Sequence, residues 1–277
     1  MNEQGDHRIL PARTNTHVLR WFRWYIRRMV RKSFNSVRVS KDSADALEVL
    51  RTSASPLVVA MNHQSWWDPL VGLLISGELC PDRPGLAPMD REMLERFAIL
   101  RRVAVFGLDP DDPASLDAMR TYVGDFMREH TGAALWLTPQ GEFADPRTPI
   151  RLRPGAAAVA ADHDGCRAVS IAIEYTFWLD KKPELFLHMS VVDPPDARSV
   201  AGWHRAFTRT MRSDNERLSR LVAGRSPDAF TPLLTSTGGG TSPVYNLWLR
   251  LRGKRTDLAS DRTARPNPPS TTDGRPA

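Results

Sequence analysis

The stretch from Val58 to Asp68 holds residue types that can move a proton. An apolar run delivers Asn62 and His63 into a polar segment, and Asp68 follows His63 by five positions. A carboxylate that accepts a hydrogen bond from one imidazole nitrogen fixes the tautomer, so that the other nitrogen can take a proton from a hydroxyl. The pattern therefore predicts a general base, His63, oriented by Asp68 and acting without a serine nucleophile.

The two side chains can face each other only if the chain between them folds as strand, turn and helix. On one continuous helix, positions five apart point in different directions. Each residue also has an ordinary structural interpretation, because Asp68 before Pro69 fits a helix N-cap and a single histidine in a loop is commonly structural or solvated. We expect a buried strand before Asn62 and a helix that begins at Asp68.

The Asn-His-x-x-x-x-Asp spacing resembles the first motif of the glycerolipid acyltransferase family, whose lysophosphatidic acid acyltransferases move an acyl chain from a thioester to a lipid hydroxyl. Residues 135–142, Leu-Trp-Leu-Thr-Pro-Gln-Gly-Glu, look like the third motif of the family, Phe-Pro-Glu-Gly-Thr-Arg. Residues 151–157 are similar to the Phe-Lys-x-Gly-Ala segment that follows it, and residues 168–175 to the fourth motif, Val-Pro-Val-Ala. The resemblance covers about residues 40–195.

This resemblance implies that His63 deprotonates an acceptor hydroxyl as it attacks a thioester carbonyl, and that Asp68 orients His63. Gly141 has no side chain, so backbone amides can approach the substrate there, and Gln140 can donate a hydrogen bond. No acyl-enzyme is expected, because the cysteines lie outside the motifs and Ser65 lacks a nucleophile elbow. The residues expected to bind substrate are Asn62, Gln140, Gly141, Glu142, Arg147 and Arg153.

The chain departs from the family at two arginines that bind phosphate. Gly107 leads into Leu-Asp-Pro, and Phe143 stands where the third motif ends in Arg. Arg147, Arg151 and Arg153 could replace these cations, or they could be solvated or pair with Asp145 and Glu142. The departure favours an acceptor that need not be a phosphomonoester, such as a hydroxyl on a glycolipid or a terpenoid. Four aromatic residues suit such an acceptor, although aromatic residues more often belong to a core: Trp66, Trp67, Trp136 and Phe143.

The elements around these motifs alternate between short apolar runs and helical patterns. We predict strands at 57–61, 103–108, 133–138, 168–175 and 185–192. We predict helices at 69–77, 90–97, 113–129, 154–163 and about 199–223. This order predicts a single α/β domain over residues 40–234, with a central, mostly parallel mixed sheet flanked by helices.

A basic amphipathic segment precedes this domain. On a helical wheel, the apolar residues from Val18 to Val30 fall on one half and Arg20, Arg23, Arg27 and Arg31 on the other. Six basic residues without an acid, and tryptophans at the boundary, favour a membrane-interface helix, which we assign to residues 16–39. The alternative is a surface helix that packs its apolar side on the core.

Composition limits the remaining interpretations. The net charge is +6, and 41% of the residues are hydrophobic, enough for a sizeable core. Residues 1–41 carry ten Lys or Arg against two acids, and residues 250–277 seven against three, so the basic charge lies at the ends. We expect residues 1–15 to be disordered and residues 235–277 to be a linker and tail rich in Ser, Thr, Gly and Pro. The two cysteines, Cys80 and Cys166, predict neither a disulfide framework nor a zinc site.

We therefore expect a peripheral membrane acyltransferase on the cytoplasmic, inner face of the cell membrane. Its expected partners are membrane lipids and an acyl thioester donor, acyl-CoA or acyl carrier protein, with no metal, no bound cofactor and no nucleic acid. The alternatives are a non-catalytic lipid-binding protein of the same fold, a thioester hydrolase, and nucleic-acid binding through the basic ends. Acceptor identity, acyl chain length, the choice of donor and the oligomeric state are not written in the sequence.

Overall fold

The computed structural model describes residues 8–178 and 180–236 of the chain. Its strands are β1 Ser36–Ser40, β2 Leu57–Met61, β3 Gly85–Asp90, β4 Val105–Leu108, β5 Ala134–Leu137, β6 Arg167–Thr176, β7 Glu184–Val192 and β8 Phe230–Thr235. Its helices are α1 Thr16–Ser33, α2 Ala44–Thr52, α3 Asp68–Leu79, α4 Arg91–Arg96, α5 Ala114–Glu129, α6 Gly155–Asp162 and α7 Val200–Ala223. Three short 3₁₀ helices complete the set: η1 Lys41–Ser43, η2 Ala98–Val103 and η3 Pro227–Ala229.

One eight-stranded sheet joins the strands in the order β4-β3-β5-β2-β6-β7-β1-β8. The first five strands in this order are parallel to one another. Strand β7 runs antiparallel to β6, β1 runs parallel to β7, and β8 runs antiparallel to β1. The predicted α/β class, with a mostly parallel mixed sheet flanked by helices, is confirmed.

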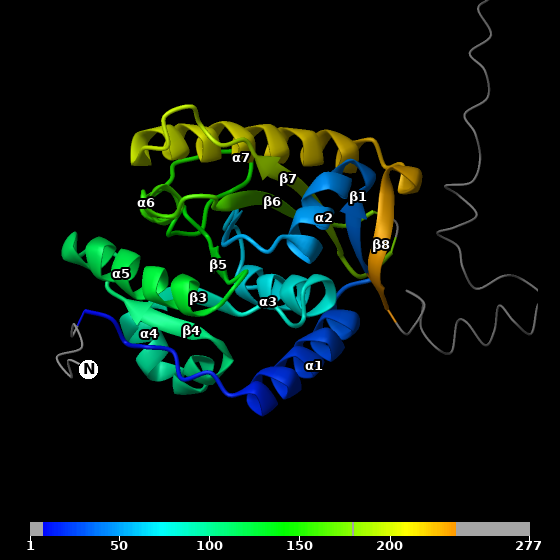
Figure 1. Cartoon of the computed structure of the whole chain (residues 1–277). Helices are drawn as coiled ribbons and strands as arrows, with labels where there is room; N and C mark the ends of the chain where they lie inside the picture. Colours follow the sequence, from blue (N-terminus) through cyan, green and yellow to red (C-terminus); the bar gives the residue numbers. More distant parts are fainter. Residues whose placement is uncertain (1–7, 179, 237–277) are drawn as a thin grey trace, which may run out of the picture.

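Helices cover both faces of the sheet. Along β2, Val59 and Met61 belong to a core shared with α1, α2 and α3, whereas Val58 and Ala60 belong to a core shared with α5, α6 and α7. All five residues of β2 are buried, as expected for a central parallel strand with helices on both faces. Figure 1 shows α7 along the upper border and α1 along the lower border of the molecule.

The end of α1 differs from the prediction. The predicted helix reached residue 39, but α1 ends at Ser33, the backbone of Phe34 is extended, and β1 follows. The sequence Ser-Val-Arg-Val-Ser alternates with the period of a strand, and β1 lies between β7 and β8. The segment after the helix therefore belongs to the central sheet.

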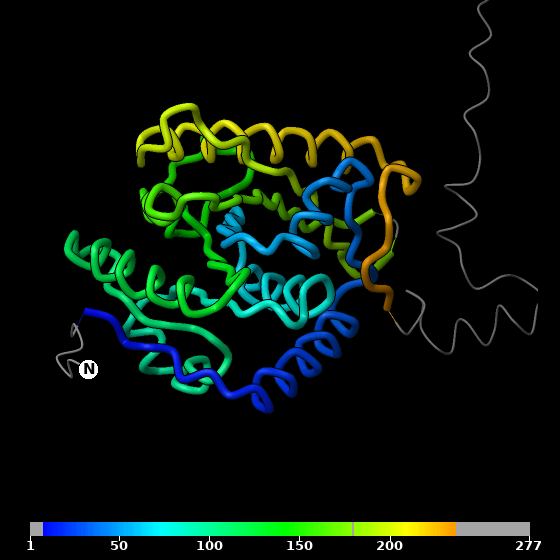
Figure 2. Tube along the Cα trace, in the orientation of Figure 1, coloured from blue at the N-terminus to red at the C-terminus, as the bar shows by residue number. Residues whose placement is uncertain are grey.

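The residues before α1 are also ordered where the structure describes them. Leu10 forms a bridge with Gly107, and the amides of Arg13 and Asn15 donate to the carbonyls of Arg101 and Arg102. Figure 2 shows this segment running along the lower border toward α1. The prediction of disorder is therefore wrong for residues 8–15, and residues 1–7 lie outside the described residues.

Three strands and one helix were missed. Strands β3 and β8 contain Pro88 and Pro232, which weaken a strand pattern, and β8 tolerates its proline as an edge strand. Strand β1 had been assigned to the preceding helix, and helix α2 was not predicted. The predicted tail lies outside the described residues beyond residue 236.

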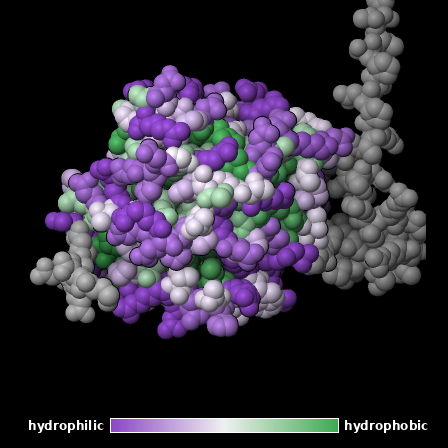
Figure 3. All heavy atoms as spheres, viewed as in Figure 1, coloured by the Kyte–Doolittle hydropathy of each residue, from purple (hydrophilic) through white to green (hydrophobic). Residues whose placement is uncertain are grey.

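No helix in the described part of the chain has both the length and the low polarity needed to cross a bilayer. On the face shown in Figure 3, hydrophilic residues predominate and hydrophobic ones appear in small groups between them.

Candidate active site

His63 and Asp68 meet at the carboxyl end of β2. Strand β2 ends at Met61, His63 lies in the following turn, and Asp68 is the first residue of α3. The distance from His63 Nδ1 to Asp68 Oδ2 is 2.9 Å. Asp68 is fully buried, whereas the His63 side chain keeps 16% of its surface exposed. The strand-turn-helix junction therefore brings the two side chains together, as the sequence analysis expected.

The Asp68 carboxylate is held inside the turn and does not cap α3. Its Oδ2 accepts hydrogen bonds from the backbone amides of Gln64, at 2.7 Å, and Ser65, at 2.8 Å. An N-cap side chain would instead accept from amides that follow it, and no such bond forms here. A carboxylate can only accept here, so it orients the N–H of His63 Nδ1 toward itself and leaves Nε2 as the ring nitrogen that could act as a general base.

Tyr175 completes this arrangement, and the sequence analysis did not select it. Its hydroxyl donates to Asp68 Oδ1 at 2.6 Å. Burial, followed by the neighbouring Asp68 charge, raises the pKa of Tyr175, so the phenol stays protonated and remains a donor. One signal was available, because Tyr175 lies near the carboxyl end of the strand that pairs in parallel with β2.

Asn62 has a structural part in this site. Its Oδ1 accepts from the amide of Ile173 at 2.8 Å, and its Nδ2 donates to the carbonyl of Ile173 at 3.1 Å. The side chain is buried and holds the ends of β2 and β6 together. These contacts give Asn62 a structural role, and its expected contact with substrate stays a prediction.

The loop after β5 fastens the backbone of His63 on both sides. Gln140 Oε1 accepts from the His63 amide at 2.8 Å, and the Ala144 amide donates to the His63 carbonyl at 2.7 Å. The Phe143 ring lies against the imidazole, with centroids 4.4 Å apart. Two motifs distant in sequence thus meet at one histidine, and Gln140 acts on the backbone of His63.

Gly141 makes this loop possible. Its φ is +72°, and a Cβ at this position would lie 2.5 Å from Nε of Arg153. Arg153 crosses over Gly141, and its guanidinium donates to the carbonyl of Pro110 and to Asp111. Arg153 therefore ties the loop after β5 to the loop after β4.

The other two charged candidates lie on the surface of the same loop. Glu142 is exposed, and Arg147 forms an ion pair with Asp145 at 2.6 Å. The Arg147 guanidinium holds the pKa of Asp145 at about 2. Burial raises the pKa of Glu174, and the charge of Arg147 opposes this shift. Arg147 and Arg153 thus both have carboxylate partners within the chain.

The loop that contacts the imidazole contains two backbone amides without an acceptor among the described residues. The amide of Gly141 donates within its own turn to Thr138, but those of Glu142 and Phe143 have no acceptor among the described residues. They are the nearest candidates for stabilising an oxyanion next to His63.

The four aromatic candidates divide into two groups. Trp136 is buried in the core and Trp67 packs against it, so neither forms an acceptor wall. Trp66, with 66% of its surface exposed, and Phe143 are open to solvent. Phe177, just after β6, is a third exposed aromatic residue, which the sequence analysis did not select.

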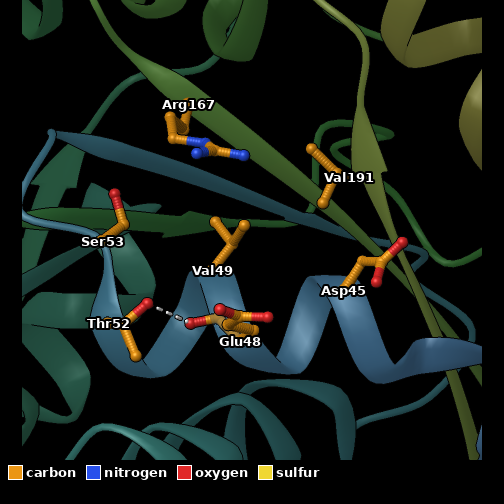
Figure 4. A pocket seen from close by; sticks show the side chains of 7 residues that line it. All are labelled: Asp45, Glu48, Val49, Thr52, Ser53, Arg167 and Val191. Atoms are coloured by element: carbon orange, nitrogen blue, oxygen red, sulfur yellow. Dashed lines mark hydrogen bonds between the residues drawn. The ribbon is translucent and has the colours of Figure 1, made fainter.

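A surface hollow lies near the amino end of β2, whereas His63 follows the carboxyl end of this strand. Arg167 pairs with Leu57 at the start of β2, so the hollow that Arg167 lines is remote from His63. Figure 4 shows it between α2 and the strands, with Asp45 and Glu48 on the helix and Val191 across from them. It takes no part in the His63 site. The described residues include no cluster of three His, Cys, Asp or Glu suited to a metal ion.

Neither the protein-family models nor the curated proteins searched give a match to this chain.

Proposed function

We propose that this chain is an acyltransferase that moves a fatty acyl group from an acyl thioester to a lipid-borne hydroxyl. The observation that supports this proposal best is the pairing of His63 with Asp68, because a fully buried carboxylate orients an imidazole that is partly open to solvent. The loop after β5, which contains the segment similar to the third motif, fastens the same histidine through Gln140 and Ala144.

In the proposed reaction, Nε2 of His63 takes the proton of the acceptor hydroxyl. The hydroxyl oxygen then forms a bond to the thioester carbonyl carbon, and the amides of Glu142 and Phe143 stabilise the resulting oxyanion. When the intermediate collapses, the carbon–sulfur bond breaks, and His63 gives the proton that it took from the hydroxyl to the leaving thiolate. The products are an ester and a free thiol. Transfer from a thioester to an alcohol is downhill, so the scheme uses no bound organic cofactor or metal.

The contacts of Arg147 and Arg153 favour an acceptor without a phosphomonoester, whereas the third candidate, the exposed Arg151, forms no ion pair with a described residue. Arg147 is paired with Asp145, and Arg153 with Asp111 and the Pro110 carbonyl. A phosphate would have to compete with these carboxylates for the guanidinium groups. The exposed rings of Trp66, Phe143 and Phe177 are better suited to an apolar alcohol or the chain of a glycolipid.

The test of the reaction is a transfer assay with labelled acyl-CoA and acyl carrier protein thioesters, with His63→Ala compared with His130→Ala. His130 is exposed at the end of α5, just before the start of β5, whereas His63 follows the carboxyl end of β2, so His130 is a matched control away from the site. We expect loss of His63 to lower kcat by about 10²- to 10⁴-fold, the range of general base catalysis, while the protein stays folded at the assay temperature although Asp68 loses one hydrogen bond. The His130 variant should retain full activity.

Three outcomes would contradict the proposal. A wild-type chain that transfers no acyl group but binds lipid would be a non-catalytic lipid-binding protein. Release of free fatty acid without an acceptor would indicate a thioester hydrolase. Equal activity of the two histidine variants would remove His63 from the chemistry.

The acceptor class is tested separately by competition between acceptors. Lysophosphatidic acid and nonphosphorylated lipid alcohols would be offered together, and the esters identified by mass spectrometry. We expect the nonphosphorylated acceptor to be preferred. A preference for lysophosphatidic acid over every other acceptor would overturn this part of the proposal and leave the reaction class standing.

A further inference from the structure

The apolar face of helix α1, which was predicted to enter the membrane, packs against the protein core. Ile26 and Val30 are fully buried, and Phe22 packs against the same core. Val18 and Leu19 pack against the cluster around Leu94. The surface-helix alternative therefore explains the predicted apolar face, and that face cannot enter a bilayer.

The outward face of α1 is aromatic instead. Trp21 and Trp24 are 55% and 58% exposed, and Tyr25, which stacks on Trp21 with centroids 5.6 Å apart, is also exposed. These residues occupy positions i, i+3 and i+4, so they share one side of the helix. Nothing in the described part of the chain covers these rings, although large aromatic side chains are usually buried.

The basic residues of α1 are divided between the two faces. Arg23 donates to the Pro81 carbonyl, and Arg27 pairs with Glu78 at 3.2 Å, so these two serve the fold. Arg20, Arg28 and Lys32 are exposed and form no ion pair with any residue that the structure describes. Arg28 and Lys32 follow Trp21 by seven and eleven positions, which places them on the aromatic side of the helix.

A second exposed apolar group lies beside α1. Phe97 and Ile99, at the junction of α4 and η2, and Met93 on α4 are all exposed. Helix α1 packs against η2. The two groups thus belong to adjacent elements that are distant in sequence.

The charge around this second group is also basic. Residues 91–103 contain four arginines against two glutamates, and one of these, Glu95, accepts from Arg91. Arg96 and Arg102 are exposed at either end of the Phe97–Ile99 junction. Exposed aromatic and aliphatic side chains ringed by cations match the headgroup region of an anionic bilayer.

We infer that the outer face of α1 and the α4–η2 junction form one docking surface for a bilayer that carries anionic headgroups. We call it the docking surface and define it by Trp21, Trp24, Tyr25, Phe97 and Ile99. The inference deepens the proposed function, which needs a lipid-borne acceptor, but its evidence is independent of His63.

The docking surface is connected to the candidate active site through the end of α1. The ring of Phe34, directly after α1, lies 5.0 Å from that of Trp67 and 5.7 Å from that of Tyr175. Trp67 in turn contacts the exposed Trp66. Docking through α1 would therefore hold Trp66 and Trp67, beside the candidate active site, close to the lipid that carries the acceptor.

Vesicle cosedimentation of the full chain tests this inference without thioester or turnover. The vesicles are phosphatidylcholine alone or phosphatidylcholine with phosphatidylglycerol. We expect the wild-type chain to pellet with the anionic vesicles and to be released by salt. Trp21→Ser with Trp24→Ser, and separately Phe97→Ser with Ile99→Ser, should each lower the partition coefficient at least about tenfold.

A pair of matched charge variants provides the control. Arg20→Gln with Arg28→Gln should lower partitioning about 30-fold, because two basic residues near an anionic surface contribute about 1 kcal/mol each. Arg209→Gln with Arg212→Gln removes the same charge from exposed positions on α7, across the sheet, and should leave partitioning unchanged. All variants are at exposed positions, and thermal unfolding monitored by circular dichroism should confirm that they fold.

Several results would overturn the inference. If the double arginine variants of α1 and α7 lost vesicle binding equally, the attraction would be unspecific. If Phe97→Ser with Ile99→Ser left partitioning unchanged, the α4–η2 junction would not belong to the docking surface. A dimer in ultracentrifugation that Trp21→Ser with Trp24→Ser dissociates, without vesicle binding, would assign the surface to a second copy of the chain. Selective binding of RNA without vesicles would assign it to a polyanion. His63→Ala should bind vesicles like the wild type, so failure of the acyl transfer proposal is distinguishable from failure of docking.

Discussion

At the scale of single residues, Tyr175 joins His63 and Asp68 from a position 107 residues after Asp68 in the sequence. We predict that Tyr175→Phe lowers kcat about tenfold with little change in KM, because Asp68 loses one of the contacts that fix it. The free energy of unfolding should fall by about 1–3 kcal/mol, since a buried carboxylate oxygen loses its partner. Steady-state kinetics and urea unfolding measure the two effects.

Tyr122→Phe is the matched control for this prediction. The Tyr122 hydroxyl accepts a hydrogen bond from the amide of Ala12, away from the site. This variant should lose some stability and keep its kcat. Equal kcat values for the two phenylalanine variants would show that Tyr175 has only a structural part.

A second residue-scale prediction concerns the buried Asp214 on α7, which lies 3.6 Å from His188 and accepts a hydrogen bond from Ser190. Burial raises the pKa of Asp214 from 3.8 to about 6, and it lowers the pKa of His188. Because the folded protein binds the Asp214 proton more tightly than the unfolded chain does, this contribution to stability is present below about pH 4. It is lost as the pH rises through about 6.

The difference between 3.8 and about 6 corresponds to about 3 kcal/mol. We therefore predict that Asp214→Asn becomes more stable relative to the wild type between pH 4 and pH 7.5, by up to about 3 kcal/mol. Urea unfolding at the two pH values measures this change. Asp196→Asn, at an exposed position, should show no such trend. A relative stability of Asp214→Asn that does not rise with pH would contradict the assignment.

At the scale of elements, the loop after β5 depends on Gly141, which is restricted both by its backbone conformation and by the side chain of Arg153. Gly141 has a φ of +72°, and Arg153 occupies the space of a Cβ. Gly165 has nearly the same φ, +74°, but nothing lies within 4 Å of a Cβ there. The two positions therefore separate the cost of backbone conformation from the cost of the clash.

We predict that Gly165→Ala lowers the free energy of unfolding by about 1–2 kcal/mol, the cost of a left-handed conformation. Gly141→Ala should cost more, and it should also lower acyl transfer, because Arg153 must move and the loop that fastens His63 moves with it. Unfolding and transfer assays on both variants check this. If Gly165→Ala reduced transfer as much as Gly141→Ala, the effect would not arise from the Arg153 contact.

At the scale of the whole molecule, the docking surface and the candidate active site are linked through α1 and Phe34. We predict that Trp21→Ser with Trp24→Ser lowers kcat/KM about tenfold for an acceptor presented in anionic vesicles. The same variant should keep its activity toward a short-chain alcohol in solution, because His63 and Asp68 are untouched. Equal losses with both acceptors would place these tryptophans in the folding of the site and not in its delivery to lipid.

The sequence alone determined the local structure and the pair at its centre. Apolar runs with little charge predicted β2, β5, β6 and β7, and helical patterns predicted the starts of α4, α5 and α7 to within about one residue. His63 and Asp68 could be selected because five residues bridge a strand end and a helix start, which is a local geometry. Local patterns gave wrong predictions at two strands. Strand β1 directly follows α1 and was assigned to that helix, and the edge strand β8 was missed because it contains a proline.

Only the tertiary structure decided what depends on contacts between distant segments. In the folded chain, the Tyr175 hydroxyl donates to Asp68 and the Asn62 side chain donates to the carbonyl of Ile173. Arg147 and Arg153 form ion pairs with Asp145 and Asp111. The tertiary structure also turned the aliphatic face of α1 inward and left the tryptophans outside. A helical wheel shows which residues share a face, but not which face meets the core. That choice is made when α3 and η2 pack against α1.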